Sequence, residues 1–341
     1  MTRICLTPAV SGTGGMVSFR NKLTAGLEGR GILVTTDLSD PSLDAVLVIG
    51  GTRQLSRLRQ VKQRGIRLVQ RLDGINWLQR KRFTGLRHFI RAEVGNFLMN
   101  TIRTSLANHI VYQSKFAQGW WQDWYGVAKS PASVIYNGVD LNCYSPSGNS
   151  KRPGEVHRLL VVEGNLGGGY DAGLENAVAL AETLHTEHGL PMEVMVVGQV
   201  AAELNARWNQ RSNIPILWAG VQPGDKIPEI DRSAHLLFAA DLHPACPNSV
   251  IEALACGLPV AAFATGSIRE LVPDDAGAIS PYGSDPWKLE KPDFHSLAQN
   301  AARVLIDPEP FRTAARMQAE RLFSLETMVE LYVSALLTGV S

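Results

Sequence analysis

The chain has 341 residues, of which 45% are hydrophobic and 19% charged, a composition that is typical of globular proteins and excludes a disordered or fibrous chain. At about 100–200 residues per domain, this length predicts two domains. The net charge of +1 hides an asymmetry, because residues 1–140 hold 19 Lys and Arg against 8 Asp and Glu, and the rest of the chain holds 14 against 24. The basic first part indicates an anionic partner: a phosphorylated substrate, a membrane surface or nucleic acid.

The cysteines and the apolar runs of the sequence indicate the cellular compartment of the protein. Cys5, Cys143, Cys246 and Cys256 form no C-x-x-C pair, which favours a reduced cytosolic protein over a disulfide framework. The first residues carry one early charge, Arg3, and no long apolar run, so we expect no signal peptide. No stretch approaches the roughly 20 apolar residues of a membrane span. We therefore expect a cytoplasmic protein.

Short apolar runs alternate along the chain with longer stretches of helical periodicity. The predicted strands are 3–6, 32–35, 45–49, 66–70, 109–112, 133–136, 158–162, 193–197, 214–218, 235–239 and 259–263. Many of them are continuous runs of Val, Ile and Leu, which is typical of parallel strands buried on both faces. The alternating order of strands and helices predicts the α/β class.

Both halves open with a strand, a glycine loop and a helix. The first loop holds Gly14 and Gly15, and the second holds Gly164 and residues 167–169. Glycine lets the backbone approach a phosphate, and the following helix N-terminus offers N–H groups and partial positive charge. The alternative is that these glycines only make tight turns. Neither loop is followed by Gly-Lys-Ser/Thr, and neither clearly fits G-x-G-x-x-G, so a dehydrogenase is weakly supported.

This duplication predicts two doubly wound Rossmann-like domains that face each other across a cleft. The polar stretch 145–155 is the predicted hinge. We therefore predict a first domain over 1–150 and a second domain over 151–311, with the C-terminal helix at about 312–341 packing back on the first domain.

The stretch from Ala245 to Val272, ACPNSVIEALACGLPVAAFATGSIRELV, is the most informative. In it, Ser249 and Glu252 are three residues apart, as are Ser267 and Glu270, and this spacing is typical of a capping box at a helix start. On one interpretation, both glutamates only cap their helices. On the other, two helix N-termini bind an anion and Glu252 accepts hydrogen bonds from a diol such as ribose.

This stretch resembles the donor site of family-four glycosyltransferases of the GT-B fold. VIYNGVDLNCYSP (134–146) resembles the segment that ends the family's N-terminal domain, and GGMVSFRNKLTAGLEGRG (14–31) resembles its first glycine loop and helix. The resemblance implies retaining, metal-independent transfer of a sugar from a nucleotide-diphosphate sugar. It also implies that the first domain (1–150) is the acceptor domain and the second (151–311) the nucleotide-sugar donor domain. It places a ribose-binding glutamate at Glu252 and backbone contacts to the sugar and diphosphate around 248–250. It implies no cofactor and no metal.

The chain departs from the family in two places. The acidic residue that usually lies eight positions before the second glutamate is Pro244 here, with Asp241 and His243 nearby. The Arg and Lys that usually neutralise the diphosphate are absent from the second glycine loop, where Asn165 and glycines stand. Arg269 is a candidate replacement cation, and helix dipoles can supply part of the charge.

Two further segments of the first half are candidates for acceptor recognition. Asp73 follows a predicted strand in RLDGINW, where it either orients a hydroxyl at the site or only makes a turn before Gly74. Residues 79–103 hold six Lys and Arg against Glu93, interleaved with aromatic residues. Such a helix is suited to an anionic lipid surface, and the alternative is a solvated helix that covers the sheet. We expect no nucleic-acid partner, because no binding motif is present.

These arguments give one set of predicted site residues. The catalytic candidates are Asp73 and Glu252. The donor-binding candidates are Gly14, Gly15, Asn165, Gly167, Gly168, Gly169, Asn248, Ser249, Val250, Glu252, Thr265 and Ser267.

The predicted function is that of a hexosyltransferase acting in polysaccharide biosynthesis, on a glycan or a lipid-linked acceptor. A peripheral contact of residues 79–103 with the inner face of the membrane accompanies this prediction. The alternatives are a non-catalytic relative that binds sugar or nucleotide and, less favoured, an NAD-dependent dehydrogenase.

Overall fold

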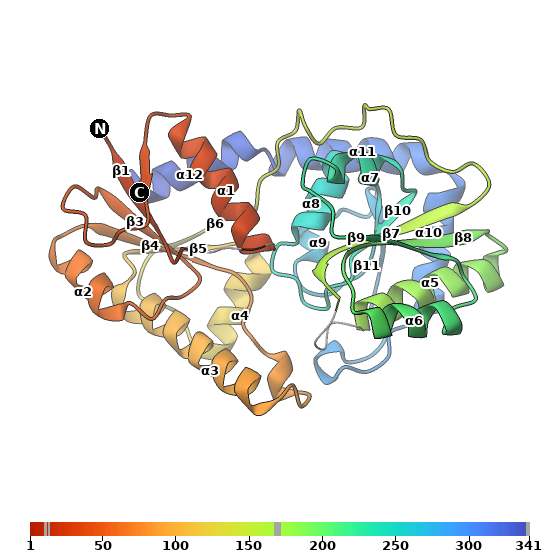
Figure 1. Ribbon diagram of the computed structural model, residues 1–341, viewed down its shortest axis with the longest axis horizontal. Helices are drawn as coiled ribbons and strands as arrows, with labels where there is room; N and C mark the ends of the chain where they lie inside the picture. The colour runs from red at the N-terminus through yellow and green to blue at the C-terminus, as the bar shows by residue number, and fades with distance from the viewer. Residues whose placement is uncertain (10–11, 13, 167–171, 339–341) are drawn as a thin grey trace. The chain divides into compact units, whose positions relative to one another are not determined.

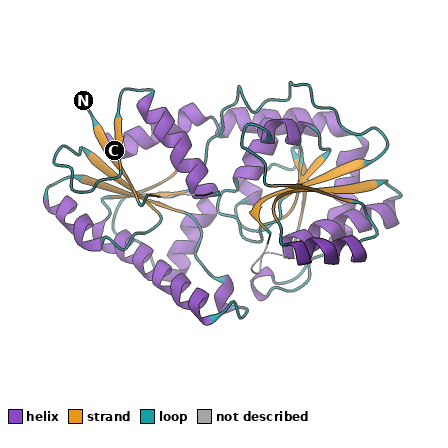
Figure 2. Cartoon of the chain, viewed as in Figure 1, coloured by secondary structure: helices purple, strands orange, loops and turns teal. Residues whose placement is uncertain are grey.

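The computed structural model describes residues 1–9, 12, 14–166 and 172–338, which form two compact units. The first unit comprises Met1–Gly138 and the segment from Leu325 onward, and the second comprises Val139–Ser324. In the described part of the chain, each unit contains one sheet of six strands, all paired in parallel and flanked by helices (Figures 1 and 2). The predicted α/β class and the presence of two doubly wound sheets are confirmed.

The sheet of the first unit has the order β2-β1-β3-β4-β5-β6. In chain order, its strands are β1 (Arg3–Thr7), β2 (Leu33–Thr35), β3 (Ala45–Ile49), β4 (Arg67–Leu72), β5 (His109–Tyr112) and β6 (Ala132–Val134). Every residue of β3 and β5 is buried, as expected for strands covered on both faces. The chain runs from β1 to β2 on one side of β1 and then continues with β3 on its other side. Open α/β sheets bind ligands at such a reversal of strand order.

Helices cover both faces of this sheet. They are α1 (Gly15–Glu28), α2 (Leu55–Gln63), α3 (Leu86–Thr101), α4 (Lys115–Tyr125) and α12 (Leu325–Leu337), with short turns η1 (Leu78–Arg80) and η2 (Ile102–Leu106). One face packs on α1 and α12, where the rings of Phe19 and Tyr332 lie 5.1 Å apart in a continuous apolar core. The helices α2 and α3 lie on the opposite side (Figure 1).

The sheet of the second unit has the order β12-β11-β10-β7-β8-β9. Its strands are β7 (His157–Asn165), β8 (Met192–Gln199), β9 (Ile216–Gly220), β10 (Leu236–Phe238), β11 (Val260–Phe263) and β12 (Gly277–Ser280). Its helices are α5 (Ala172–His188), α6 (Ala202–Arg211), α7 (Ile227–Arg232), α8 (Asn248–Ala255), α9 (Ile268–Leu271), α10 (Phe294–Ile306) and α11 (Pro308–Leu322), with the turn η3 (Pro286–Lys288). Side chains of α5, α6 and α10 form one core with the sheet.

The boundary between the units differs from the prediction. It lies at Gly138 and Val139 rather than at residue 150, and the polar stretch 145–155 belongs to the second unit. The predicted C-terminal helix over 312–341 is divided, because α11 belongs to the second unit and only α12 packs in the first. Phe323 and Ser324 separate these helices, and the Val139 N–H donates to the Phe323 carbonyl (2.8 Å) where the chain leaves each unit.

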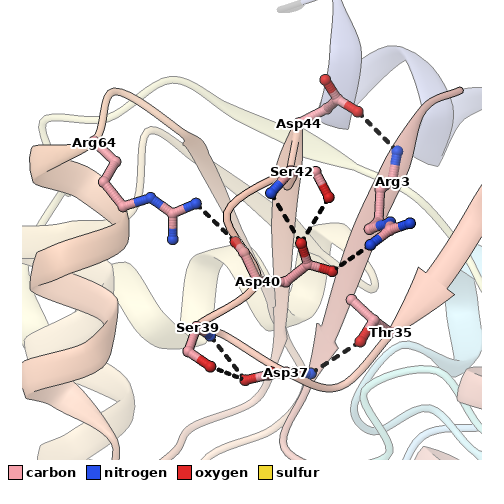
Figure 3. A network of polar contacts seen from close by, with 8 residues as sticks. All are labelled: Arg3, Thr35, Asp37, Ser39, Asp40, Ser42, Asp44 and Arg64. Atoms are coloured by element: carbon pink, nitrogen blue, oxygen red, sulfur yellow. Dashed lines mark hydrogen bonds and ion pairs between the residues drawn. The ribbon is translucent and has the colours of Figure 1, made fainter.

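A polar network fixes the amino edge of the first sheet, opposite the edge where ligands bind. The Asp40 carboxylate accepts hydrogen bonds from the backbone and the hydroxyl of Ser42 and pairs with the Arg3 guanidinium at 2.7 Å (Figure 3). The Ser42 bonds, followed by Arg3, lower the pKa of Asp40 to about 2. The Arg3 N–H also donates to Asp44, just before β3. These acids therefore hold the β2–β3 connection in place.

Candidate functional site

The predicted donor site lies at the carboxyl edge of the second sheet, where the turns after β10 and β11 meet. The Ser267 N–H donates to the Pro244 carbonyl at 2.9 Å. Gly266 has φ +57, and a Cβ atom there would lie 2.6 Å from the Pro244 backbone. Only glycine fits this close approach without strain. The two turns, and with them the starts of α8 and α9, are therefore held together.

The first turn of α8 offers backbone donors to a ligand. Pro247 occupies the N-cap position, and Ile251 makes the first helical hydrogen bond, to the Pro247 carbonyl. The N–H groups of Ser249 and Val250 precede that bond and have no acceptor within the helix. Such groups, with the positive end of the helix dipole, favour an anion. The suggested capping box of Ser249 and Glu252 is wrong, because proline and not serine caps the helix.

Glu252 lies half-buried on the second turn of α8, within electrostatic reach of α7 and of Tyr144. Burial, reinforced by the charge of Glu252, raises the pKa of Asp231 well above its usual range. Asp231 is fully buried, so its protonated form is the favoured one. The acid at the rim of this site is therefore Glu252, with Asp231 behind it on α7.

The second turn, 265–267, is less open than predicted. Thr265 and Ser267 are both buried, Ser267 completely. The Ser267 hydroxyl makes no cap bond to α9, so the second suggested capping box is also wrong. Among the described residues, this buried hydroxyl has no hydrogen-bond partner. Such a group is usually satisfied by water or a ligand, and here it lies beside Pro244.

His243 takes a defined position next to Pro244. Its imidazole stacks on the Trp287 indole with 3.6 Å between ring centroids and 12° between planes. Burial lowers the pKa of His243 to about 4, against the opposing effect of Asp285. A neutral, buried imidazole therefore stands one residue before the position where the family carries an acid. The sequence analysis missed Trp287, because it follows β12, the one strand that was not predicted.

Glu163, near the end of β7, lies within electrostatic reach of Asp241, which follows β10. Burial, with a further contribution from Asp241, raises the pKa of Glu163 to about 8. Glu163 precedes Gly164 and Asn165, where the pairing of β7 with β8 is irregular. Asn165 ends the strand, and the predicted contacts at Gly167, Gly168 and Gly169 lie outside the described residues. The sequence analysis overlooked Glu163 as a candidate site residue. The signal was an acidic residue directly after the buried apolar run 158–162.

The first unit contains a separate pocket of about 370 Å³ at the carboxyl edge of its own sheet. Asp73 and the arginines Arg53 and Arg91 line it, together with Ile49 at the end of β3 and the next three residues, 50–52. Burial raises the pKa of Asp73, and the nearby Arg71 guanidinium opposes that rise. Asp73 thus lines a pocket, and its role in orienting a hydroxyl stays a prediction. Its backbone carbonyl supports the turn, because it accepts a hydrogen bond from Trp121 Nε1 at 2.7 Å.

Gly14 and Gly15 lie at the start of α1 in the first unit. Gly14 has φ +129, a conformation suited to glycine, and Gly15 begins the helix. Met16, the next residue, lines the same pocket as Asp73. The glycines are therefore placed beside the pocket of the first unit, at the carboxyl edge of the sheet, which is the edge where open α/β sheets generally bind ligands.

Arg269 is not placed with the predicted donor residues. It pairs with Asp274 at 3.6 Å and lines a pocket of about 280 Å³ near the start of β12, with Asn300 and Arg303. Of the predicted donor-binding residues that the structure describes, none lines that pocket. Within the described ranges, no three His, Cys, Asp or Glu side chains gather where they could hold a metal ion.

Comparisons with known proteins relate this chain to glycosyltransferases. Residues 158–307 match the family model described as glycosyl transferases group 1. The 2-deoxystreptamine glucosyltransferase of Streptomyces kanamyceticus is 27% identical over 211 residues, which cover 58% of this chain and 51% of that protein. The alignment thus spans about half of that relative's length.

Solved structures share the fold over nearly the whole chain. Sucrose-phosphate synthase from Thermosynechococcus elongatus has a TM-score of 0.76 at 17% identity and covers 98% of both chains. The Anabaena protein HepE, solved in complex with UDP-glucose, has a TM-score of 0.72 at 16% identity, with 98% of this chain and 99% of that chain covered. The GT-B fold is therefore confirmed. Within this fold, the part of the chain that matches the group 1 glycosyltransferase family model is residues 158–307, in the second unit.

Proposed function

We propose that this protein transfers a hexose from a nucleoside diphosphate sugar to an acceptor hydroxyl, with retention at the anomeric carbon and without a metal ion. The observation that carries the proposal is the junction of turns at Pro244 and Gly266, which holds the open N-terminus of α8 beside Glu252. The ligand named for HepE, UDP-glucose, supports UDP sugars as the first donors to test.

On the donor side, the backbone N–H groups of Ser249 and Val250 bind the diphosphate. Glu252 accepts hydrogen bonds from the ribose hydroxyls. Because the second glycine loop lacks the family's cationic pair, the α8 dipole carries more of the diphosphate charge here. His243, held neutral by Trp287, donates to or accepts from a hydroxyl of the donor sugar.

On the acceptor side, the pocket that holds Asp73 binds the acceptor. Arg53 and Arg91 favour an acceptor that carries a phosphate or a carboxylate. Asp73 orients the reacting hydroxyl or a hydroxyl of the donor sugar. The acceptor named for the Streptomyces relative, 2-deoxystreptamine, serves as the contrasting acceptor in an assay.

In the reaction, the bond between the anomeric carbon and the diphosphate oxygen breaks, and the acceptor oxygen forms its bond to the same face of that carbon. The acceptor proton passes to the leaving phosphate oxygen, so no separate base is required. Catalysis then rests on positioning and on stabilising the charge that develops on the diphosphate.

The test is release of UDP from UDP-glucose and other UDP sugars, with and without EDTA and with acceptors that carry or lack a phosphate. We expect release that chelation leaves intact, and a product whose anomeric proton shows retention. Loss of activity in EDTA would refute metal independence, and an inverted product would refute retention.

A second candidate is a non-catalytic relative that binds nucleotide or sugar. Pro244 in place of the usual acid, next to a neutral His243, favours it. Binding of UDP-glucose without turnover, with every acceptor in the panel, would support this alternative.

A further inference from the structure

The helix α3 and the turn before it expose an unusual share of apolar surface. Six of the sixteen exposed large apolar side chains among the described residues fall within positions 83–97. The most exposed are Phe83 (91%), Leu86 (68%), Phe97 (66%) and Ile90 (53%). Leu86, Ile90 and Phe97 recur at intervals that place them on one side of a helix. We call these four residues the α3 apolar face. Exposed apolar clusters of this kind mark interaction sites.

Basic side chains border this face and are little offset by acids. Residues 51–103 hold 13 Lys and Arg against Asp73 and Glu93. Lys81 and Arg87 are exposed beside the face, whereas Arg80 is already paired with Glu93 at 2.6 Å. That ion pair lowers the pKa of Glu93. The one acid on α3 is therefore charged and paired with Arg80, and it does not offset the charge of Lys81 or Arg87. The surface thus combines apolar side chains with unbalanced positive charge.

This combination selects one occupant among three. A nucleic acid would pair its phosphates with the Lys and Arg side chains but would leave the exposed phenylalanines without a partner. A second copy would bring two basic surfaces together, and like charges repel. An anionic bilayer accounts for both the apolar side chains and the positive charge. The apolar residues enter the boundary with the acyl chains, and the Lys and Arg side chains contact lipid phosphates. Among the described helices, none is long and apolar enough to cross a membrane.

We propose that the α3 apolar face docks this protein on anionic lipid bilayers, with α3 lying in the plane of the headgroups. The helix has 16 residues and so presents about 24 Å of length to the surface. Arg91 and Val94 of the same helix line the pocket of the first unit, so a docked protein holds that pocket close to the lipid. This last consequence, delivery of a membrane-borne acceptor, rests on the proposed function, whereas docking itself does not.

The experiment is flotation of the full chain with vesicles of phosphatidylcholine alone and of phosphatidylcholine with 30% phosphatidylglycerol, without any nucleotide sugar. We expect binding to the anionic vesicles that weakens with rising salt. The variant Phe83→Ser/Leu86→Ser/Ile90→Ser should bind at least tenfold more weakly, as should Lys81→Gln/Arg87→Gln. The matched control Val127→Ser/Val221→Ser changes two exposed apolar residues elsewhere and should bind like the unaltered protein.

A second measurement reports directly on insertion. A fluorophore on Phe83→Cys, in a Cys143→Ser background that removes the exposed cysteine, should shift to the blue on anionic vesicles. A protein that stays unbound with anionic vesicles overturns the proposal, as does a serine variant that binds like the control. Concentration-dependent dimers that the serine variant abolishes, without vesicle binding, would instead assign the face to a second copy. Because no donor is present, these outcomes are independent of transferase activity.

Discussion

His243 and Trp287 stack face to face, with 3.6 Å between their ring centroids, and this contact joins the turn after β10 to the turn after β12. It buries the imidazole beside the predicted donor site and lowers its pKa to about 4. The relationship is central to the donor site, because it fixes a neutral hydrogen-bonding group next to Pro244.

The substitution Trp287→Leu should remove the stacking partner of the His243 imidazole and expose that ring to solvent. The pKa of His243 should rise from about 4 toward its ordinary value of about 6.5, because the imidazole becomes solvated. Donor affinity should fall about threefold to tenfold. Two-dimensional NMR of the histidine ring and calorimetry with UDP test both effects. Trp124→Leu in the first unit is the control and should leave the His243 titration unchanged.

Glu252→Ala should weaken binding of the nucleoside diphosphate by about 1–3 kcal/mol, as a lost charge-assisted hydrogen bond does. Isothermal calorimetry gives the affinity, and thermal unfolding gives the stability. Glu229→Ala, which removes an exposed glutamate paired with Lys226, is the matched control. Unchanged affinity with a lowered melting temperature would mean that Glu252 only supports the packing of α8 on α7.

Asp73→Asn should lower kcat about 100-fold or more, as expected for a group that positions a reacting hydroxyl. Binding of UDP should not change, because the proposed donor site lies in the second unit. The control is Asp123→Asn, an exposed aspartate of α4. If Asp73→Asn retains full activity, the aspartate serves only through its carbonyl bond to Trp121.

Glu163→Gln should change the pH dependence of stability. The raised pKa of Glu163, about 8, exceeds its ordinary value of 4.5, so the folded state loses stability as the pH rises from about 4.5 through 8. Glutamine carries no such charge, so the variant should be about 2–4 kcal/mol more stable than the unaltered protein at pH 9 and nearly equal to it at pH 4. Urea unfolding at both pH values tests this. Equal pH profiles for the two proteins would contradict the buried position of Glu163.

The strands that the sequence predicts correctly are those with strong local signals. The runs at Ala45–Ile49 and His109–Tyr112 are continuous and apolar, and the structure has strands at the same residues. The strand β12, Gly277–Ser280, is short and begins with glycine, so its pattern does not stand out from a turn. It forms because Gly277 allows close contact with Val260 of β11, where a Cβ atom would lie 2.1 Å from the carbonyl.

In the candidate site too, features formed by residues adjacent in the chain could be predicted, and contacts between distant residues could not. The motif around Asn248–Glu252 was readable because its residues are adjacent in the chain. The stack of His243 on Trp287, and the approach of Pro244 to Gly266, join residues far apart in sequence and leave no spacing to detect. The two capping boxes were wrong because spacing does not decide which residue caps a helix or whether its side chain reaches the helix. Pro247, and not Ser249, is the N-cap of α8, and Ser267 is the N-cap of α9 but its hydroxyl makes no cap bond.

The most direct test of the donor site is thermal unfolding of the unaltered protein and Glu252→Ala with UDP, GDP, ADP and NAD, each with EDTA. The proposal predicts that one nucleoside diphosphate stabilises the unaltered protein, by about 2.7 kcal/mol at 100 times its dissociation constant. The same ligand should stabilise Glu252→Ala less. Stabilisation by NAD alone, or by none of the four ligands, would contradict a donor site at α8.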